Sequence, residues 1–128
     1  MPTERNRAGI VLTYTFVVFL FCIGLDKIVQ TNLITNWQLI VGPTVQFLLP
    51  FSLGTVVMIE GAVEILLGIL LLTRWKKYSI AVLVVTILLV IVDLFILHFY
   101  NLAIHEAMFI AVLAAIYLLD QESAHSVT

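Results

Sequence analysis

The chain has 128 residues, of which 62% are hydrophobic and only 11% are charged. A soluble domain carries about 25% charged and about 45–50% apolar residues, so this composition is that of a membrane protein. Six basic and eight acidic residues give a net charge of −2, which provides no basic surface for nucleic acid. A single cysteine, Cys22, excludes an internal disulfide and any metal site built from several cysteines.

Four apolar stretches are long enough to cross the hydrocarbon core as helices, which takes roughly 20 residues. We expect the spans at residues 8–28, 51–73, 79–100 and 102–119. The first resembles the start of a signal peptide, but no small-x-small cleavage site follows it, so we expect it to be retained. The apolar runs are continuous rather than alternating, which favours helices over strands. The sequence therefore predicts an all-α membrane protein, with residues 1–128 forming one domain built as an antiparallel four-transmembrane-helix bundle.

The basic residues indicate how the bundle is oriented. If all four spans cross, one side receives Arg5, Arg7, Arg74, Lys76 and Lys77, and only Lys27 lies on the other. Basic residues flanking membrane spans are concentrated on the cytoplasmic side. We therefore predict a multi-pass protein of the plasma membrane with both termini in the cytoplasm.

The longest segment between spans, residues 29–50, follows the first span and is predicted to be an external amphipathic loop. Polar residues alternate there with Ile34, Trp37 and Leu39, while Pro43 and Pro50 disfavour helix just before them. One interpretation is a short helix in the interface with Trp37 at headgroup depth. Another is a lid over a site in the outer half of the bundle, and the two are compatible. The short later links predict that the second, third and fourth spans are antiparallel neighbours.

Small residues mark the expected packing faces, because membrane helices associate through close packing. The second span carries glycines at strict seven-residue spacing, namely Gly54, Gly61 and Gly68. The fourth span carries an alanine stripe of Ala103, Ala107, Ala111, Ala114 and Ala115. We expect both sets to face neighbouring helices and Leu71 to face lipid.

Ionisable residues inside spans are costly, so each calls for a reason. The candidates come from all four spans: Lys27, Glu60, Glu64, Asp93, His98, His105 and Glu106. Counted from the outer ends, Glu64 lies near mid-membrane and the others in the outer half. A shared depth predicts a polar pocket in the outer half of the bundle. The structural alternatives are that Lys27 only snorkels to the interface and that Glu60 and Asp93 only join helices by hydrogen bonds.

Three chemistries are compatible with such a pocket to different degrees. A di-metal carboxylate site lacks the Glu-x-x-His pairs that it would need. A mononuclear site built from His98, His105 and one acid stays open, although we assign no metal. A pocket that handles protons or faces a quinone needs only buried carboxylates and a nearby histidine, so it is the most economical. Cys22 has no charged activator within its span, which argues against nucleophilic catalysis.

Two motifs resemble a known family. The first span ends in Gly24-Leu25-Asp26-Lys27, and a loop containing Trp37 and Pro43 follows. The second span reads Gly61-Ala62-Val63-Glu64-Ile65-Leu66-Leu67-Gly68-Ile69-Leu70-Leu71, with Arg74 just after it. This order resembles the DoxX-like family of small four-helix membrane proteins, whose pattern has Gly-x-x-Lys after the first helix and Glu-x-x-x-Gly-x-x-Leu in the second. The match covers roughly residues 9–74.

The resemblance implies a role in membrane oxidoreductase systems, including quinone-linked thiosulfate-oxidising subunits and redox-stress complexes. It marks Lys27 and Glu64 as signature positions, and it does not cover Asp93, His98, His105 or Glu106. The chain has no motif for haem, flavin or nicotinamide, so we expect no intrinsic cofactor, and a quinone or a partner subunit would carry the electrons.

The leading hypothesis is a small integral membrane subunit of an oxidoreductase system, itself non-catalytic or quinone-facing. Its expected partners are the lipid bilayer and either further copies of the chain or other membrane subunits, with no nucleic acid. A small oligomeric transporter or channel that uses the same acids for protons or a cation is the alternative, followed by a purely structural accessory subunit.

Overall fold

The computed structural model describes residues 4–126, with side chains at Glu4 and at residues 6–121. Its elements are α1 (Glu4–Val29), the 3₁₀ helix η1 (Trp37–Ile40), α2 (Pro43–Leu48), α3 (Leu53–Leu70), α4 (Lys76–Ile96) and α5 (Tyr100–Ser126). Helices α1, α3, α4 and α5 are long and apolar enough to cross a membrane. The prediction of an all-α bundle with four membrane-spanning helices is confirmed.

The helix ends differ from the predicted ones where side chains and turns override hydropathy. Helix α3 begins at Leu53 rather than at residue 51, because the hydroxyl of Ser52 accepts the N–H of Thr55 and caps it. Helix α4 ends at Ile96 rather than at residue 100. His98 adopts a left-handed conformation (φ 64°) in the turn after the helix. Glycine is the usual residue in this position, and a histidine there does not mark the helix end in the sequence.

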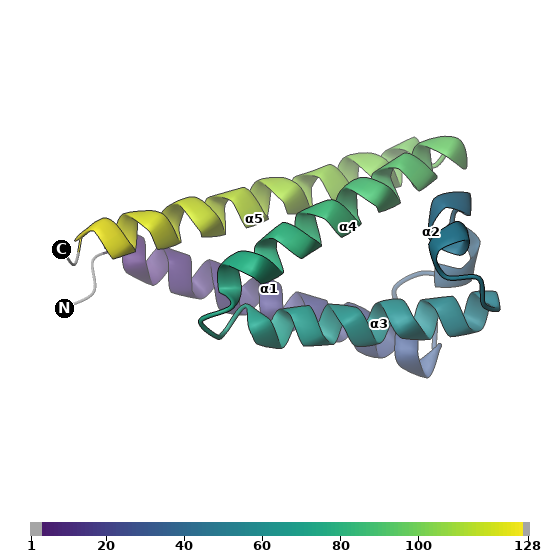
Figure 1. Cartoon of the computed structure of the whole chain (residues 1–128), viewed down its shortest axis with the longest axis horizontal. Coiled ribbons are helices and arrows are strands. Elements are labelled where there is room, and N and C mark those ends of the chain that lie inside the picture. Colours follow the sequence, from purple (N-terminus) through teal and green to yellow (C-terminus); the bar gives the residue numbers. More distant parts are fainter. Residues whose placement is uncertain (1–3, 127–128) are drawn as a thin grey trace.

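The helices form two pairs that diverge at one end (Figure 1). Helix α1 packs mainly along α3, and α4 packs mainly along α5, while α1 also contacts α5. Helices α3 and α4 are antiparallel, but they touch little beyond their short link, so the expectation that they are close neighbours is only partly correct. At the open end, α2 lies between α3 and α4, while the start of α1 and the end of α5 lie at the opposite end of the bundle, on the side of the α3–α4 link (Figure 1). The loop segment thus takes the place of a direct α3–α4 contact.

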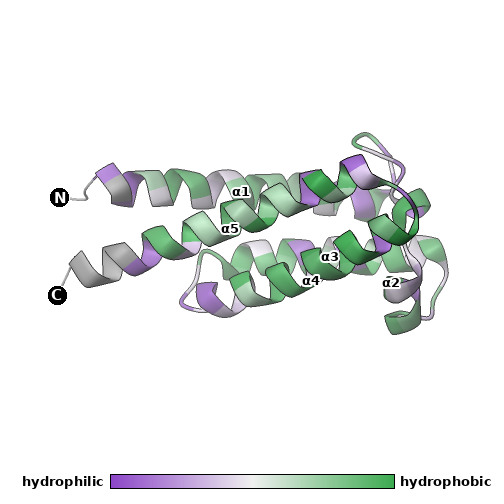
Figure 2. Cartoon of the chain, turned by 90° about the horizontal axis from the view of Figure 1, so that it is seen from above, coloured by the Kyte–Doolittle hydropathy of each residue, from purple (hydrophilic) through white to green (hydrophobic). Residues whose placement is uncertain are grey.

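Outward-facing apolar side chains cover the spans. Figure 2 shows hydrophobic residues along the length of the four long helices, with hydrophilic ones concentrated towards their ends. Val11, Val85 and Leu118 are each more than half exposed. Such residues lie on a bilayer-facing surface without cost, because lipid is as apolar as they are.

The core lies at the end of the bundle where α3 turns into α4. It contains Phe16, Val17, Leu20, Leu67, Leu71, Ile80, Leu83, Ile87, Leu113 and Ile116. The prediction that Leu71 faces lipid is wrong: the residue is 1% exposed, because at the end of α3 it packs into this core with residues of α1, α4 and α5. Ser79 strengthens this junction, since its buried hydroxyl donates to the carbonyl oxygen of Leu67 at 2.7 Å.

Glycines bring α1 and α3 together, as predicted. A Cβ atom at Gly61 would lie 2.5 Å from the carbonyl oxygen of Gly24 and 2.9 Å from the Cβ atom of Lys27. At Gly68 the same atom would make ordinary contact with Leu20, at 3.6 Å. Of the three glycines of α3, only Gly61 therefore lies at a backbone approach that a larger residue would prevent.

Most of the alanine stripe of α5 does not face a helix of this chain. Ala103 is buried, but Ala107, Ala111 and Ala114 are exposed. The packing side of α5 is formed instead by larger residues such as Leu113 and Ile116, which reach across the gap to α1 and α4. Within the described residues, the prediction of an alanine packing face is therefore wrong for Ala107, Ala111 and Ala114, while Ala103 is buried and Ala115 is half-buried.

Candidate functional site

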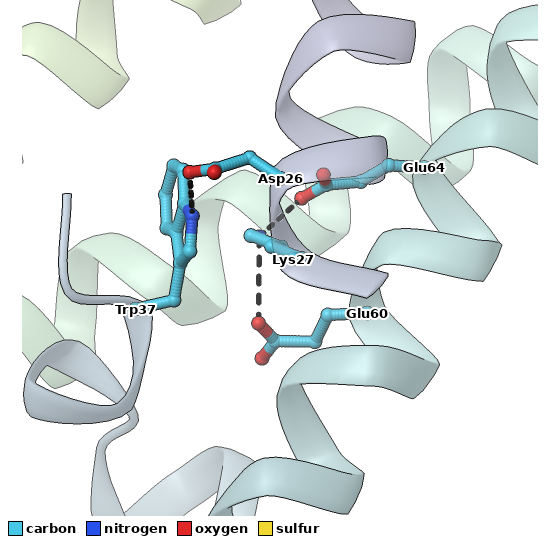
Figure 3. A network of polar contacts seen from close by, with 5 residues as sticks. All are labelled: Asp26, Lys27, Trp37, Glu60 and Glu64. Atoms are coloured by element: carbon cyan, nitrogen blue, oxygen red, sulfur yellow. Dashed lines mark hydrogen bonds and ion pairs between the residues drawn. The ribbon is translucent and has the colours of Figure 1, made fainter. Parts of the chain in front are cut away.

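Lys27 is the centre of a buried ionic cluster. It lies in the last turn of α1, and its residue is 7% exposed. Its Nζ atom is 2.6 Å from Oε1 of Glu64 and 3.4 Å from Oε2 of Glu60, as Figure 3 shows. The two glutamates stand one turn apart on α3 and both point at the ammonium group (Figure 3). The pairing compensates charges that lipid would otherwise make costly.

The close approach at Gly61 explains why this pairing forms. Because α1 and α3 nearly touch there, the side chain of Lys27 passes directly over α3 and reaches Glu64 one turn further along. A lysine that only snorkelled would extend away from the bundle. The snorkelling alternative is therefore wrong for Lys27.

Trp37 covers the cluster from the loop. Its indole Nε1–H donates to Oδ2 of Asp26 at 2.7 Å, and the ammonium group of Lys27 lies 4.7 Å from its ring centroid (Figure 3). The residue is only 8% exposed. The hydrogen bond and the cation–π contact hold the ring over the cluster, which supports the lid interpretation.

Asp26 holds the start of the loop in place. Besides Trp37, its carboxylate accepts the hydroxyl of Thr31 at 2.6 Å and the backbone N–H groups of Leu33 and Ile34 at 2.9 and 3.2 Å. Four donors from residues 31–37 converge on one side chain, so Asp26 determines where the lid begins. The sequence alone did not predict this role for Asp26. A carboxylate at a helix end followed by a polar loop is the signal that could have indicated it.

Asp93 anchors the other end of the lid. Its two carboxylate oxygens accept the backbone N–H groups of Thr44 and Val45, both at 3.0 Å, at the start of α2. Gly42 lies so close to Asp93 that any Cβ atom there would collide with the carboxylate. Instead of joining long helices, as the structural alternative proposed, Asp93 fixes α2 to α4.

A cavity of about 330 Å³ lies under this lid. Its walls come from four helices and the loop, and they are mostly apolar. The aromatic lining consists of Phe16, Phe19, Trp37 and Phe109, and the ionisable lining consists of Lys27, Glu60, Glu64, Asp93 and Glu106. Five of the seven predicted pocket residues therefore border one space.

The two predicted histidines are placed elsewhere. His98 lies in the turn between α4 and α5, where its Nδ1 atom is 2.8 Å from the hydroxyl of Tyr100 on the exposed surface. His105 is exposed on α5. Neither borders the cavity, and the described residues contain no group of three His, Cys, Asp or Glu side chains placed to hold a metal ion. The hypothesis of a mononuclear site at these histidines has no geometry to support it.

The cluster leaves one buried acceptor without a donor. Oε2 of Glu64 is buried and has no hydrogen-bond partner. Such an atom is costly in a low-dielectric interior and is commonly matched by a ligand or an ordered water. The ion pair with Lys27 therefore satisfies only one of the two carboxylate oxygens of Glu64.

No known family model matches the chain, and no curated protein or solved structure has detectable similarity to it. The resemblance to DoxX-like proteins thus depends on the short motifs around Lys27 and Glu64 alone.

Proposed function

We propose that this small multi-pass membrane protein is a quinone-facing subunit of a membrane oxidoreductase system, and that its cavity takes the head group of the quinone. The observation that carries the proposal is an apolar cavity, lined by aromatic rings, that ends at the Lys27–Glu64 ion pair. Ligand sites of this kind combine apolar walls with a few placed polar groups.

The size and lining of the cavity suit such a ligand. A volume of about 330 Å³ is at the lower end of small-molecule pockets, which suits a single substituted ring. Phe16, Phe19 and Phe109 provide flat apolar surfaces for that ring. The motif resemblance to DoxX-like proteins, with Lys27 and Glu64 at signature positions, supports the same role. Electrons would come from a partner subunit.

The orientation follows from the distribution of charge. Arg7, Arg74 and Lys77 lie towards the end of the bundle that holds both termini, and Lys27 lies towards the other end. Under the positive-inside rule, we propose that the protein lies in the plasma membrane with its termini in the cytoplasm and its lid outside.

Quinone binding can be measured with tetramethylbenzoquinone and the protein in mild detergent. In a Trp75→Phe background, Trp37 reports on the cavity by fluorescence. We expect saturable quenching, and we expect Ile87→Phe, which intrudes on the cavity wall, to abolish saturation. Val85→Phe on the lipid-facing side of α4 is the matched control and should behave as the parent does. Quenching that rises without saturation, and equally in both variants, would refute the proposal.

The excess of acidic over basic groups favours a second candidate, a small transporter or channel. Glu60, Glu64 and Glu106 border the cavity with one lysine, so a proton or another cation would be attracted there. Reconstituted vesicles with a pH-sensitive dye would distinguish the two. A proton flux that is lost in Glu64→Gln would favour transport. No proton flux in the parent protein, together with saturable quinone binding, would favour the subunit role.

A further inference from the structure

The cavity reaches the surface of the bundle at an opening formed by Leu48, Val63 and Leu89, which we call the mouth. Val63 of α3 and Leu48 of α2 both border the cavity, and they are 39% and 57% exposed. A residue that borders a cavity and is also exposed lies where the cavity meets the surface. Leu89 of α4 borders the cavity too and is half-buried. The mouth therefore lies between α3 and α4, where the two helices diverge around α2 (Figure 1).

The side of the cavity between α1 and α5 is more closed. Phe19 of α1 borders the cavity and is exposed to nearly the same extent as Val63. However, its ring centroid lies 4.9 Å from that of Phe109 on α5, and the ring centroid of Phe16 lies 6.3 Å from the same ring. Aromatic rings at such distances are in contact. Because these three rings bridge α1 and α5, the wider opening is the mouth on the α3–α4 side.

The mouth lies at the depth of the lipid acyl chains. Val63 is about ten residues from the start of α3 at Leu53, which is about 15 Å along a helix. Leu89 is about seven residues from the end of α4 at Ile96, which is about 10 Å. The hydrocarbon core is about 30 Å thick, so both residues lie well inside it. The mouth therefore opens into lipid and not into water.

The surface around the mouth is apolar. The exposed side chains of α3 and α4 at this depth include Leu66, Val85 and Leu88. A ligand dissolved in the bilayer meets the mouth directly, whereas a water-soluble ligand would first have to cross lipid. A cavity of about 330 Å³ has room for a single ring but not for a long chain as well. A chain on that ring would have to leave through the mouth.

We propose that the cavity takes a ring that carries a long hydrocarbon chain, with the ring inside and the chain passing between α3 and α4 into the bilayer. This inference rests on the proposed function, because it assumes that the ring is a quinone. It adds the class of quinone, a lipid-soluble one, and the route of its chain. Lys27 and the mouth border the same cavity, so a ring near the ion pair is compatible with a chain in lipid.

The experiment compares two ligands that share one ring. Tetramethylbenzoquinone has no chain, and its decyl analogue carries a ten-carbon chain in place of one methyl group. Each is titrated calorimetrically into the full chain in mild detergent, and each affinity is corrected for partition into micelles, measured without protein. We expect both ligands to bind the parent protein saturably, because the mouth lets the chain leave the cavity.

Variants narrow the mouth from its two sides. We expect Val63→Trp and Leu89→Trp to lower the affinity for the decyl analogue at least about tenfold relative to that for tetramethylbenzoquinone, because the larger side chain and the ligand chain compete for one space. Retained binding of tetramethylbenzoquinone shows that a variant is folded. Leu66→Trp and Val85→Trp, exposed on the same helices and outside the cavity lining, are the matched controls and should keep the affinity ratio of the parent.

A photoreactive analogue locates the chain in the protein without a substitution. It carries a diazirine on the third carbon of the chain, close to the ring, and mass spectrometry identifies the labelled residues. We expect labels around Val63 and Leu89 that an excess of tetramethylbenzoquinone removes. Labels around Phe19 and Phe109 instead would contradict the inference. Labels at the mouth that the excess does not remove would also contradict it, because the mouth would then take any lipid chain.

The outcomes separate the inference from the proposed function. If the decyl analogue binds the two mouth variants as tightly as the parent, the inference is wrong while the quinone site stands. The same holds if tetramethylbenzoquinone binds the parent and the decyl analogue does not. If neither ligand binds the parent saturably, both the proposed function and the inference are wrong.

Discussion

Replacement of Gly61 by alanine tests the link between helix packing and the ionic cluster. The added methyl group would lie 2.5 Å from the carbonyl oxygen of Gly24, whereas ordinary contacts of a Cβ atom begin near 3.4 Å. Helices α1 and α3 would have to separate by close to an ångström. The same methyl group would press on the Cβ atom of Lys27, whose ammonium group is paired with Glu64.

The size of the effect follows from a matched substitution. Gly68→Ala lies on the same face of α3, but its methyl group would make ordinary contact with Leu20 at 3.6 Å. Both changes gain the same helix propensity, about 0.5–1 kcal/mol. The difference between them is therefore the overpacking cost at Gly61, about 1–3 kcal/mol. Gly68→Ala should be neutral or stabilising, and Gly61→Ala destabilising.

Thermal unfolding in mild detergent, followed by the loss of the monodisperse peak in size-exclusion chromatography, measures this difference. We expect Gly61→Ala to melt several degrees below Gly68→Ala. Equal melting temperatures, or a more stable Gly61→Ala, would show that α1 and α3 do not meet at this glycine, and the explanation for the position of Lys27 would fail with it.

Two further predictions concern the lid and the orientation. Asp93→Ala removes the acceptor for both N–H groups at the start of α2. A reporter cysteine introduced by Val45→Cys, on the cavity side of the lid, should then react with a water-soluble maleimide at least about fivefold faster than in the parent, because loss of a buried hydrogen bond costs about 1 kcal/mol or more. An unchanged rate would contradict the anchoring role of Asp93. In a Cys22→Ser background, an impermeant maleimide added to whole cells should label Asn36→Cys and leave Lys77→Cys unmodified, and the reverse pattern would overturn the orientation.

The sequence by itself determined the four membrane-spanning helices. Their length is imposed by the thickness of the hydrocarbon core, and backbone groups in lipid must be satisfied within each helix, so a long apolar run has few other solutions. It also indicated the tight glycine at Gly61, because seven-residue spacing keeps small residues on one side of a helix. The sequence also predicted the grouping of Lys27, Glu60 and Glu64, because unpaired charges inside a membrane span are costly and are usually found paired.

Only the tertiary structure decided how the helices pair and what the loop does. Hydropathy does not distinguish a side that faces lipid from one that faces another helix, because both are apolar, and this is why Leu71 and the exposed Ala111 were assigned wrongly. The roles of Asp26 and Asp93 depend on backbone N–H groups of a loop whose path no periodicity encodes. The cavity exists because that loop, held by these two carboxylates, lies where α3 and α4 diverge, and long-range contacts of this kind arise only when the whole chain is folded.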